Sequence, residues 1–272
     1  MNYRASCAAA KVNGADLAAY CLMLGDDALI ASQRLAEWRI RATKLETAVV
    51  FANIGLDLLE QARSLLGRAG AVDPATVPHT PAGTAVSAED ALAFFRERAE
   101  FRCVRLVTQV NGDFASSILR LLVFSTYRQA QLNRLLSSQD PVLAGVAVNG
   151  SKEAAYHRDY AAGWVTALAR GTADSRRRVQ TAVRRVWPDV GELFVPHPVE
   201  VRLTAAKVAV NPARLRTEFE SVIAEVFDAA ELRVPSTRTS SKRAGRAGLH
   251  SEDLGLLLAD MQSVARTHPS RR

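Results

Sequence analysis

Apolar residues recur along most of this chain at alternating steps of four and three positions. In the first such run, from Asp16 to about Arg41, the apolar or small positions are Leu17, Cys21, Leu24, Ala28, Ala31, Leu35 and Trp38. This spacing places them on one face of a helix and predicts a helix that packs lengthwise against others. Because Gly25 interrupts the run, we expect a break or kink near Gly25-Asp26-Asp27.

Capping residues and helix breakers divide the rest of the chain into further helices. Thr43 can cap the second helix, where Glu46 would complete a capping box, and Gly70 would end it. Later helices are predicted from Ser87 to about Val110, Asp113 to about Ser138, Asp140-Pro141 to about Arg170, Asp174 to Leu193, Asn211-Pro212 to about Leu232 and Ser251 to about Thr267. Pro188 would bend or end the sixth helix. The stretches between them at 71–86 and 234–249 are predicted loops.

The same pattern gives the fold class. In the fourth helix the predicted core positions are Ile118, Leu121, Leu122, Leu132 and Leu135. No segment shows the strict alternation of apolar and polar residues that is typical of a strand. Long helices with mostly short connections predict an all-α bundle of antiparallel neighbours. The spacing gives no sign of a second core, so residues 1–272 are predicted to form a single domain, with residues 1–13 flexible.

Composition supports a globular protein. The chain has 272 residues, of which 48% are hydrophobic and 23% are charged, the proportions of an ordinary folded domain. Its cysteines, Cys7, Cys21 and Cys103, have no disulfide or metal spacing, which favours a reducing, cytoplasmic setting. The N-terminus lacks the apolar core of a signal peptide, and no apolar run is long enough to cross a membrane.

Net charge raises the question of an anionic partner. The formal charge is +7, with basic residues concentrated in Arg176 to Arg185 and Arg238 to Arg246. Neither run is interleaved with aromatic residues, so we favour solvated surfaces over nucleic-acid binding. Residues 245–255 are glycine-rich, and these glycines with Lys242, Arg243, Arg246 and His250 could cradle a phosphate at the start of the last helix. We favour the alternative, a loop that lets this helix, capped by Ser251, dock on the bundle.

Five segments carry a family resemblance. They are residues 25–38 (GDDALIASQRLAEW), 51–63 (FANIGLDLLEQAR), 111–115 (NGDFA), 152–157 (KEAAYH) and 245–262 (GRAGLHSEDLGLLLADMQ). In this order and spacing they resemble the C subunits of bacterial phenylacetyl-CoA epoxidases, multicomponent monooxygenases of phenylacetate breakdown. The chain departs from these subunits at Val110, Ser125 and Tyr127, which leaves the CoA ester that the system oxidises open.

The resemblance implies a fold and a role. The fold would be a ferritin-like four-helix bundle with additional helices. The chain would pair tightly with a catalytic A subunit of the same fold, whose di-iron centre adds one oxygen atom to the aromatic ring of a CoA thioester, while a reductase subunit supplies electrons. The C subunit itself would be a non-catalytic structural subunit that stabilises the A subunit.

The ligand chemistry can be tested on the residues themselves. A ferritin-like di-iron site takes a Glu from each of two helices and a Glu-x-x-His pair from each of two others. The histidines are His79, His157, His197, His250 and His268, and three residues before them stand Thr76, Ala154, Phe194, Ala247 and Ala265. None of these is acidic. The sequence therefore predicts no metal ligand set, no cofactor and no catalytic residue in this chain.

A set of polar residues could still point into the bundle: Glu37, Asp57, Glu60, Glu153 and His157. One interpretation is an oxygen-rich metal site, but a single imidazole suits non-haem iron poorly. We favour a polar remnant of an ancestral site, whose charges are paired with buried arginines such as Arg34 or Arg63, because unpaired buried charges are costly. Simple exposure to solvent is the third interpretation.

Two functions follow. The leading hypothesis is a non-catalytic subunit of a phenylacetyl-CoA epoxidase-type monooxygenase, in a hetero-oligomer with the A subunit and the other subunits, with self-association also possible. The alternative is a ferritin-like, metal-dependent oxidase or hydroxylase that acts on its own. The stoichiometry and any contact of this chain with CoA are left open by the sequence.

Overall fold

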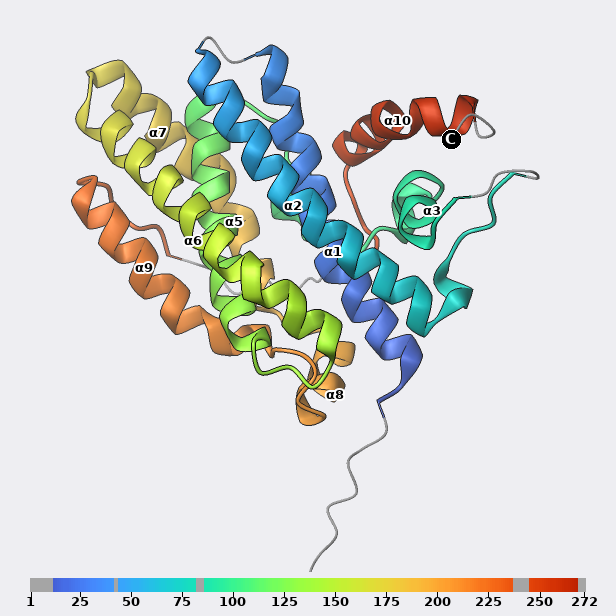
Figure 1. Ribbon diagram of the computed structural model, residues 1–272. Coiled ribbons are helices and arrows are strands. Elements are labelled where there is room, and N and C mark those ends of the chain that lie inside the picture. Colours follow the sequence, from blue (N-terminus) through green and yellow to red (C-terminus); the bar gives the residue numbers. More distant parts are fainter. Residues whose placement is uncertain (1–11, 42–43, 82–85, 237–244, 269–272) are drawn as a thin grey trace, which may run out of the picture.

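Four long helices form the centre of the molecule. The structure is a computed structural model that describes residues 12–41, 44–81, 86–236 and 245–268. Within these ranges the chain forms α-helices, 3-10 helices and loops, and no strand. The central helices are α1 Gly14–Ala36, α2 Leu45–Val72, α5 Phe114–Leu135 and α6 Pro141–Arg170 (Figure 1). The predicted all-α, ferritin-like bundle with additional helices is confirmed.

Two helical hairpins build this bundle. α1 packs along α2, α5 packs along α6, and α2 also contacts α6. The predicted core positions of α5 are all buried: Ile118, Leu121, Leu122, Leu132 and Leu135. The predicted face of α1 is buried as well, with only Ala31 partly accessible. The spacing of apolar residues therefore identified the packed faces correctly.

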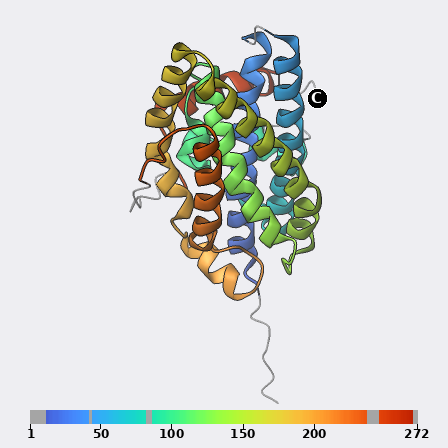
Figure 2. The ribbon, with the colours of Figure 1, turned by 90° about the vertical axis from the view of Figure 1, so that its left-hand side faces the viewer.

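Additional helices flank the bundle. α7 Ala173–Val186 and α9 Arg216–Ala229 contact α5 and α6, and the short α8 Pro198–Ala205 contacts α1 (Figure 2). Elsewhere, α3 Ala88–Phe94 packs on α2, and α10 Glu252–Thr267 packs on α3. The remaining elements are short: η1 Glu37–Ile40, η2 Pro74–Thr76, η3 Arg98–Glu100, α4 Arg105–Thr108, η4 Trp187–Phe194 and η5 Pro212–Leu215.

Several predicted helix ends are confirmed by their caps. The Asp140 carboxylate accepts from the backbone N–H groups of Val142 and Leu143 and starts α6, which ends at Gly171. Asp113 caps α5 and Ser87 caps α3 in the same way. These side chains satisfy N–H groups that have no partner inside the first turn of a helix.

The predicted break at Gly25 is wrong. α1 continues without interruption through Gly25, Asp26 and Asp27, and all three residues are buried. A Cβ on Gly25 would lie 2.9 Å from a methyl carbon of Leu66, so the glycine allows α2 to approach α1 closely. The glycine therefore serves helix packing and does not break the helix.

The long helix predicted from Ser87 to about Val110 is also wrong. It is replaced by α3, η3 and the single turn α4, joined by extended backbone. In the extended part, the N–H groups of Arg102 and Val104 donate to the carboxylates of Asp26 and Asp27 instead of to helix carbonyls. Two buried carboxylates of α1 thus serve as acceptors for a distant segment of extended backbone, in place of helix carbonyls.

Other boundaries differ by a few residues. α2 begins at Leu45, with Lys44 as an N-cap that makes no side-chain bond, and Thr43 lies outside the described residues. α2 also continues past Gly70, which is buried where a Cβ would lie 2.6 Å from the Cβ of Ala88. The sixth predicted helix becomes a 3-10 helix from Trp187 onward, next to Pro188 as expected.

One α-helix was not predicted from the sequence, and two predicted segments lie only partly within the described residues. α8 was not predicted, although His197 and Glu200 form a capping box around Pro198 at its first turn. Of the N-terminal residues predicted to be flexible, Asn13 caps α1, and residues 1–11 lie outside the described residues. Of the predicted loop at 234–249, residues 234–236 and 245–249 are described and are not helical.

Candidate functional site

Four of the five predicted polar residues come together, and one does not. Asp57 and Glu60 of α2 and Glu153 of α6 line an open pocket of about 110 Å³ between the two helices. His157 of α6 adjoins it through Asp57. Glu37 lies elsewhere, at the start of η1. The five residues therefore do not form one site.

The contact between His157 and Asp57 joins α6 to α2. His157 is buried, and its Nε2 lies 2.9 Å from Oδ2 of the half-exposed Asp57. Burial lowers the pKa of His157 below its ordinary value of 6.5, and the neighbouring Asp57 carboxylate opposes this shift. When the imidazole is neutral, its Nε2–H can donate to the Asp57 carboxylate.

Glu153 is held by an amide. Its Oε2 accepts from Nε2 of Gln61 at 2.8 Å. Partial burial raises the pKa of Glu153, and the nearby carboxylates of Asp57 and Glu60 add to this effect. Arg63, which we expected to be buried and to neutralise such carboxylates, is exposed on α2.

Glu37 has a different set of partners. Its Oε1 accepts from Nη1 of the buried Arg34 at 2.7 Å, as predicted. Its Oε2 accepts from Nδ2 of Asn111 at 2.8 Å, and the same amide also donates to the Arg34 carbonyl. Glu37 therefore ties the end of α1 to the loop that precedes α5.

A buried arginine that was not among the predicted residues, Arg128, lies where the four central helices meet. From α5, its guanidinium donates to Oε1 of Gln61 on α2 at 3.1 Å and to the Leu24 carbonyl on α1 at 3.3 Å. Since Gln61 in turn donates to Glu153 on α6, one chain of hydrogen bonds joins all four helices. We call Arg128, Gln61 and Glu153 the Arg128 network.

This arrangement bears on metal binding. In a ferritin-like di-iron site the ligands project inward from the central helices. Here a guanidinium and an amide occupy part of that interior. Among the described residues, no group of three or more His, Cys, Asp or Glu side chains is arranged to hold a metal ion. The absence of a metal site stays a prediction for the whole chain.

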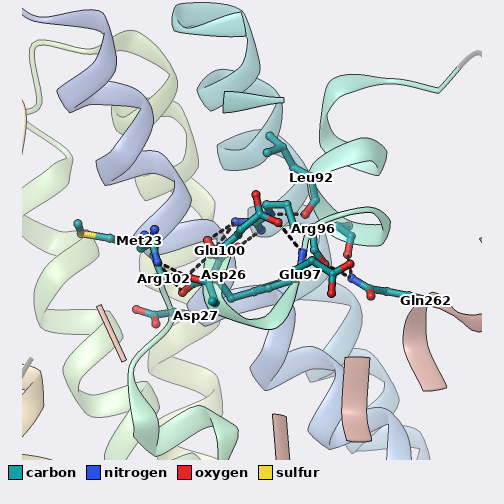
Figure 3. Close-up of polar contacts among 12 residues, drawn as sticks. Met23, Asp26, Asp27, Leu92, Arg96, Glu97, Glu100, Arg102 and Gln262 are labelled. Carbon is teal, nitrogen blue, oxygen red and sulfur yellow. Dashed lines mark hydrogen bonds and ion pairs between the residues drawn. The ribbon is translucent and has the colours of Figure 1, made fainter. Parts of the chain in front are cut away.

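A second polar cluster lies in the middle of α1 (Figure 3). The Asp26 carboxylate pairs with Arg96 through both oxygens and also accepts from the Arg102 N–H at 2.7 Å. The adjacent Asp27 carboxylate pairs with Arg246, with 2.6 Å between Nη2 and Oδ2. All four charged side chains are almost fully buried. Two buried ion pairs therefore fasten two distant segments to α1.

The glycine-rich segment before α10 is part of this cluster. The Gly245 N–H donates to Oε1 of the buried Glu192 at 2.8 Å, and a Cβ on Gly245 would lie 2.3 Å from the Cys103 carbonyl. Gly248 has a φ of +79°, a conformation that suits glycine. Because Arg246 is buried and engaged with Asp27 and with the Met23 and Arg102 carbonyls, this part of the segment supports docking of α10 and not a phosphate cradle. Lys242 and Arg243 lie outside the described residues.

None of the helices in the described ranges is long and apolar enough to cross a membrane.

Comparisons with known proteins agree with this architecture. A family model described as "Phenylacetic acid catabolic protein" matches residues 2–272. The chain is also 38% identical, over 256 residues, to the C subunit of the 1,2-phenylacetyl-CoA epoxidase of Escherichia coli (strain K12), and this match covers 94% of the chain and 98% of that relative. The chain therefore belongs to the phenylacetic acid catabolic protein family.

Proposed function

We propose that this chain, folded as one domain, is the non-catalytic structural subunit of a phenylacetyl-CoA epoxidase-type monooxygenase. In this proposal it stabilises the di-iron catalytic A subunit, and the oxygen chemistry takes place in that partner. The support from similarity is a family match along nearly the whole chain and a relative that is named as the C subunit of such an enzyme.

The Arg128 network carries the proposal. Two divalent iron ions between the central helices would need inward carboxylates and imidazoles. The interior instead holds the positive charge of Arg128, which is 1% exposed, and Gln61, whose amide already bridges Arg128 and Glu153. In a poorly screened interior, a fixed guanidinium repels a metal cation strongly. The imidazole of His157, on α6, is engaged with Asp57.

An exposed apolar surface supports the role of a partner subunit. On α2, Leu45 is 76%, Val49 is 48% and Leu56 is 62% exposed, at a spacing that places them along one side of the helix. Leu56 also lines a groove of about 280 Å³ between α1 and α2. Large contiguous apolar patches on a protein usually mark an interaction site.

This surface continues to α10. A second groove, of about 610 Å³, lies between the end of α1 and α10 and shares Gln33 and Ala36 with the first. Asp260 lines this second groove, and the exposed Leu256 and Val264 lie one helical turn to either side of it. We call the exposed sides of α2 and α10, with the two grooves between them, the α2–α10 surface. Its apolar character suits an obligate interface, which commonly buries more than about 2,000 Å².

Metal analysis tests the non-catalytic assignment. The chain is expressed with added iron, purified alone and analysed for iron, in parallel with the catalytic A subunit of the same system. We expect well under one iron per chain here and a loaded di-iron centre in the A subunit. A content of about two irons per chain, with oxidase activity in the absence of other subunits, would establish the rival function.

A further inference from the structure

Arginines are distributed over the sides of α7 that do not face the core and over the end of α6. They are Arg170, Arg176, Arg177, Arg178, Arg184 and Arg185, which together we call the arginine face. α7 turns Val179, Ala182, Val183 and Val186 toward the core, so the arginines lie on the remaining sides. The side chains of Arg177 and Arg178 are 69% and 58% exposed. The arginine face therefore contributes little to the packed core.

Few carboxylates compensate this charge. Arg177 and Arg178 share Asp174, while Arg170 and Arg176 each lie 3.9 Å from Glu231. Arg178 also lies 3.9 Å from Asp113.

The two remaining arginines contact neutral groups. Arg184 donates to the Thr181 hydroxyl at 2.9 Å, and Arg185 donates to the Val110 carbonyl at 3.0 Å. Among the described residues, the six arginines thus have three carboxylates as ion-pair partners: Asp113, Asp174 and Glu231. Repulsion among the surplus positive charges opposes folding, so the fold alone gives no reason for the cluster.

We propose that the arginine face binds an acidic surface of a partner protein. A guanidinium presents two parallel N–H donors that match a carboxylate, and the shared carboxylates hold several of these groups in place while leaving donors free. A helix of this length spans about 21 Å, which suits a protein interface. The interspersed carboxylates of Asp113, Asp174 and Glu231 would oppose a continuous phosphate backbone.

The position of the arginine face makes this a separate contact. α7 and α10 lie on opposite sides of the bundle in Figure 1, so an acidic partner on α7 leaves the α2–α10 surface free. The chain could then hold two partners at once. This inference does not depend on the chain being non-catalytic, since it concerns a different side of the molecule.

Binding of an acidic polypeptide tests the proposal. The probe is a fluorescently labelled poly-L-glutamate of about 20 residues, and its Kd for the full chain is measured by anisotropy at low salt. The variant carries Arg177→Gln and Arg184→Gln. The matched control carries Arg63→Gln and Arg214→Gln, which remove the same charge from exposed positions on α2 and η5. A thermal melt of each variant confirms that the fold is retained.

We expect the α7 variant to bind poly-L-glutamate roughly fivefold to tenfold more weakly than the unchanged chain, with the control within about twofold. Binding should also weaken as ionic strength rises from about 20 to about 200 mM, because exposed charges are screened. Equal losses in both variants, or no measurable binding, would overturn the proposal. So would equally tight binding of a 20-nucleotide single-stranded DNA that the α7 variant also loses, since the face would then accept any polyanion.

Discussion

Several charged side chains are buried in this protein, so we expect single substitutions at them to affect stability strongly. Arg96, Arg128 and Arg246 all lie in the interior, and each is engaged by a carboxylate or an amide from another element. A buried charge of this kind persists only when it is paired and hydrogen-bonded. Removal of one partner is therefore expected to cost far more than removal of both.

The pair Asp27–Arg246 allows a direct test. Arg246→Met leaves a buried carboxylate without its cation, and we expect the free energy of unfolding to fall by about 3–5 kcal/mol. The double variant with Asp27→Asn removes both charges and should recover a substantial part of this loss. Urea unfolding of the single and double variants measures both effects. A double variant that is less stable than Arg246→Met would contradict the explanation.

His157 gives the stability a defined pH dependence. Its folded pKa lies below its ordinary value of 6.5, because burial disfavours the imidazolium. As the pH falls from about 7 through that folded value, the unfolded chain takes up the proton first, so the free energy of unfolding decreases.

His157→Gln, which keeps an N–H donor for Asp57, should make this decrease smaller. The pKa of His250 is also lowered by burial, so the variant with His250→Gln as well should be flatter still. Urea unfolding between pH 7.5 and 5 checks this order. An unchanged slope in His157→Gln would show that the pKa of His157 is the same in the folded and unfolded states.

At the scale of elements, glycine lies in a packed contact in one helix and at an open position in another. Gly25 lies in the contact between α1 and α2, whereas a Cβ on Gly163 of α6 would meet no described atom within 4 Å beyond its chain neighbours and the backbone of its own helix. A glycine in a helix costs stability unless close packing requires it. The two positions are thus a matched pair of helical glycines in different surroundings.

Substitution should separate them. Gly25→Val overpacks the contact with Leu66 and is expected to destabilise the protein by about 1–3 kcal/mol. Gly163→Ala should stabilise it by about 0.5–1 kcal/mol, because the alanine meets open space and favours the helix. Thermal unfolding of the two variants measures whether each substitution lowers or raises the stability. Destabilisation by Gly163→Ala would contradict the open space at this position, because the added methyl group would then contact another part of the protein.

At the scale of the whole molecule, the exposed apolar residues are unevenly distributed. Leu56 of α2 and Val264 of α10 border the α2–α10 surface, while Leu136 and Val201, which are also exposed, lie at the end of α5 and on α8. If the proposed partner covers the first pair, polar substitutions there should affect assembly and leave the isolated chain intact. Substitutions in the second pair should affect neither.

Co-purification with the catalytic A subunit measures this difference. Leu56→Asp with Val264→Asp should weaken the complex by at least about tenfold, because a charge would be desolvated in an apolar interface. The control, Leu136→Asp with Val201→Asp, should co-purify like the unchanged chain. Equal recovery of the A subunit with both variants would place the interface on another side of the molecule.

Local signals were sufficient for much of the fold. A cap and the N–H groups that it satisfies are separated by two or three residues, so Asp113, Asp140 and Ser87 marked the starts of their helices from sequence alone. The helical repeat likewise identified the buried side of α5. The absence of a Glu-x-x-His pair is equally a property of neighbouring residues, and it led to the proposed function.

Only the tertiary structure decided the interior. Asp26 and Arg96 are 70 positions apart in the chain, and Asp27 and Arg246 are 219 apart. No local pattern links such residues. The sequence therefore predicted a break in α1 that the structure does not have. It also predicted one long helix from Ser87 to about Val110, where Asp26 and Asp27 instead accept from extended backbone. The interior position of Arg128 and the separation of Glu37 from the other polar candidates were hidden for the same reason. Side-chain pairing in a helical bundle depends on which helices become neighbours, and that is settled only when the whole chain packs.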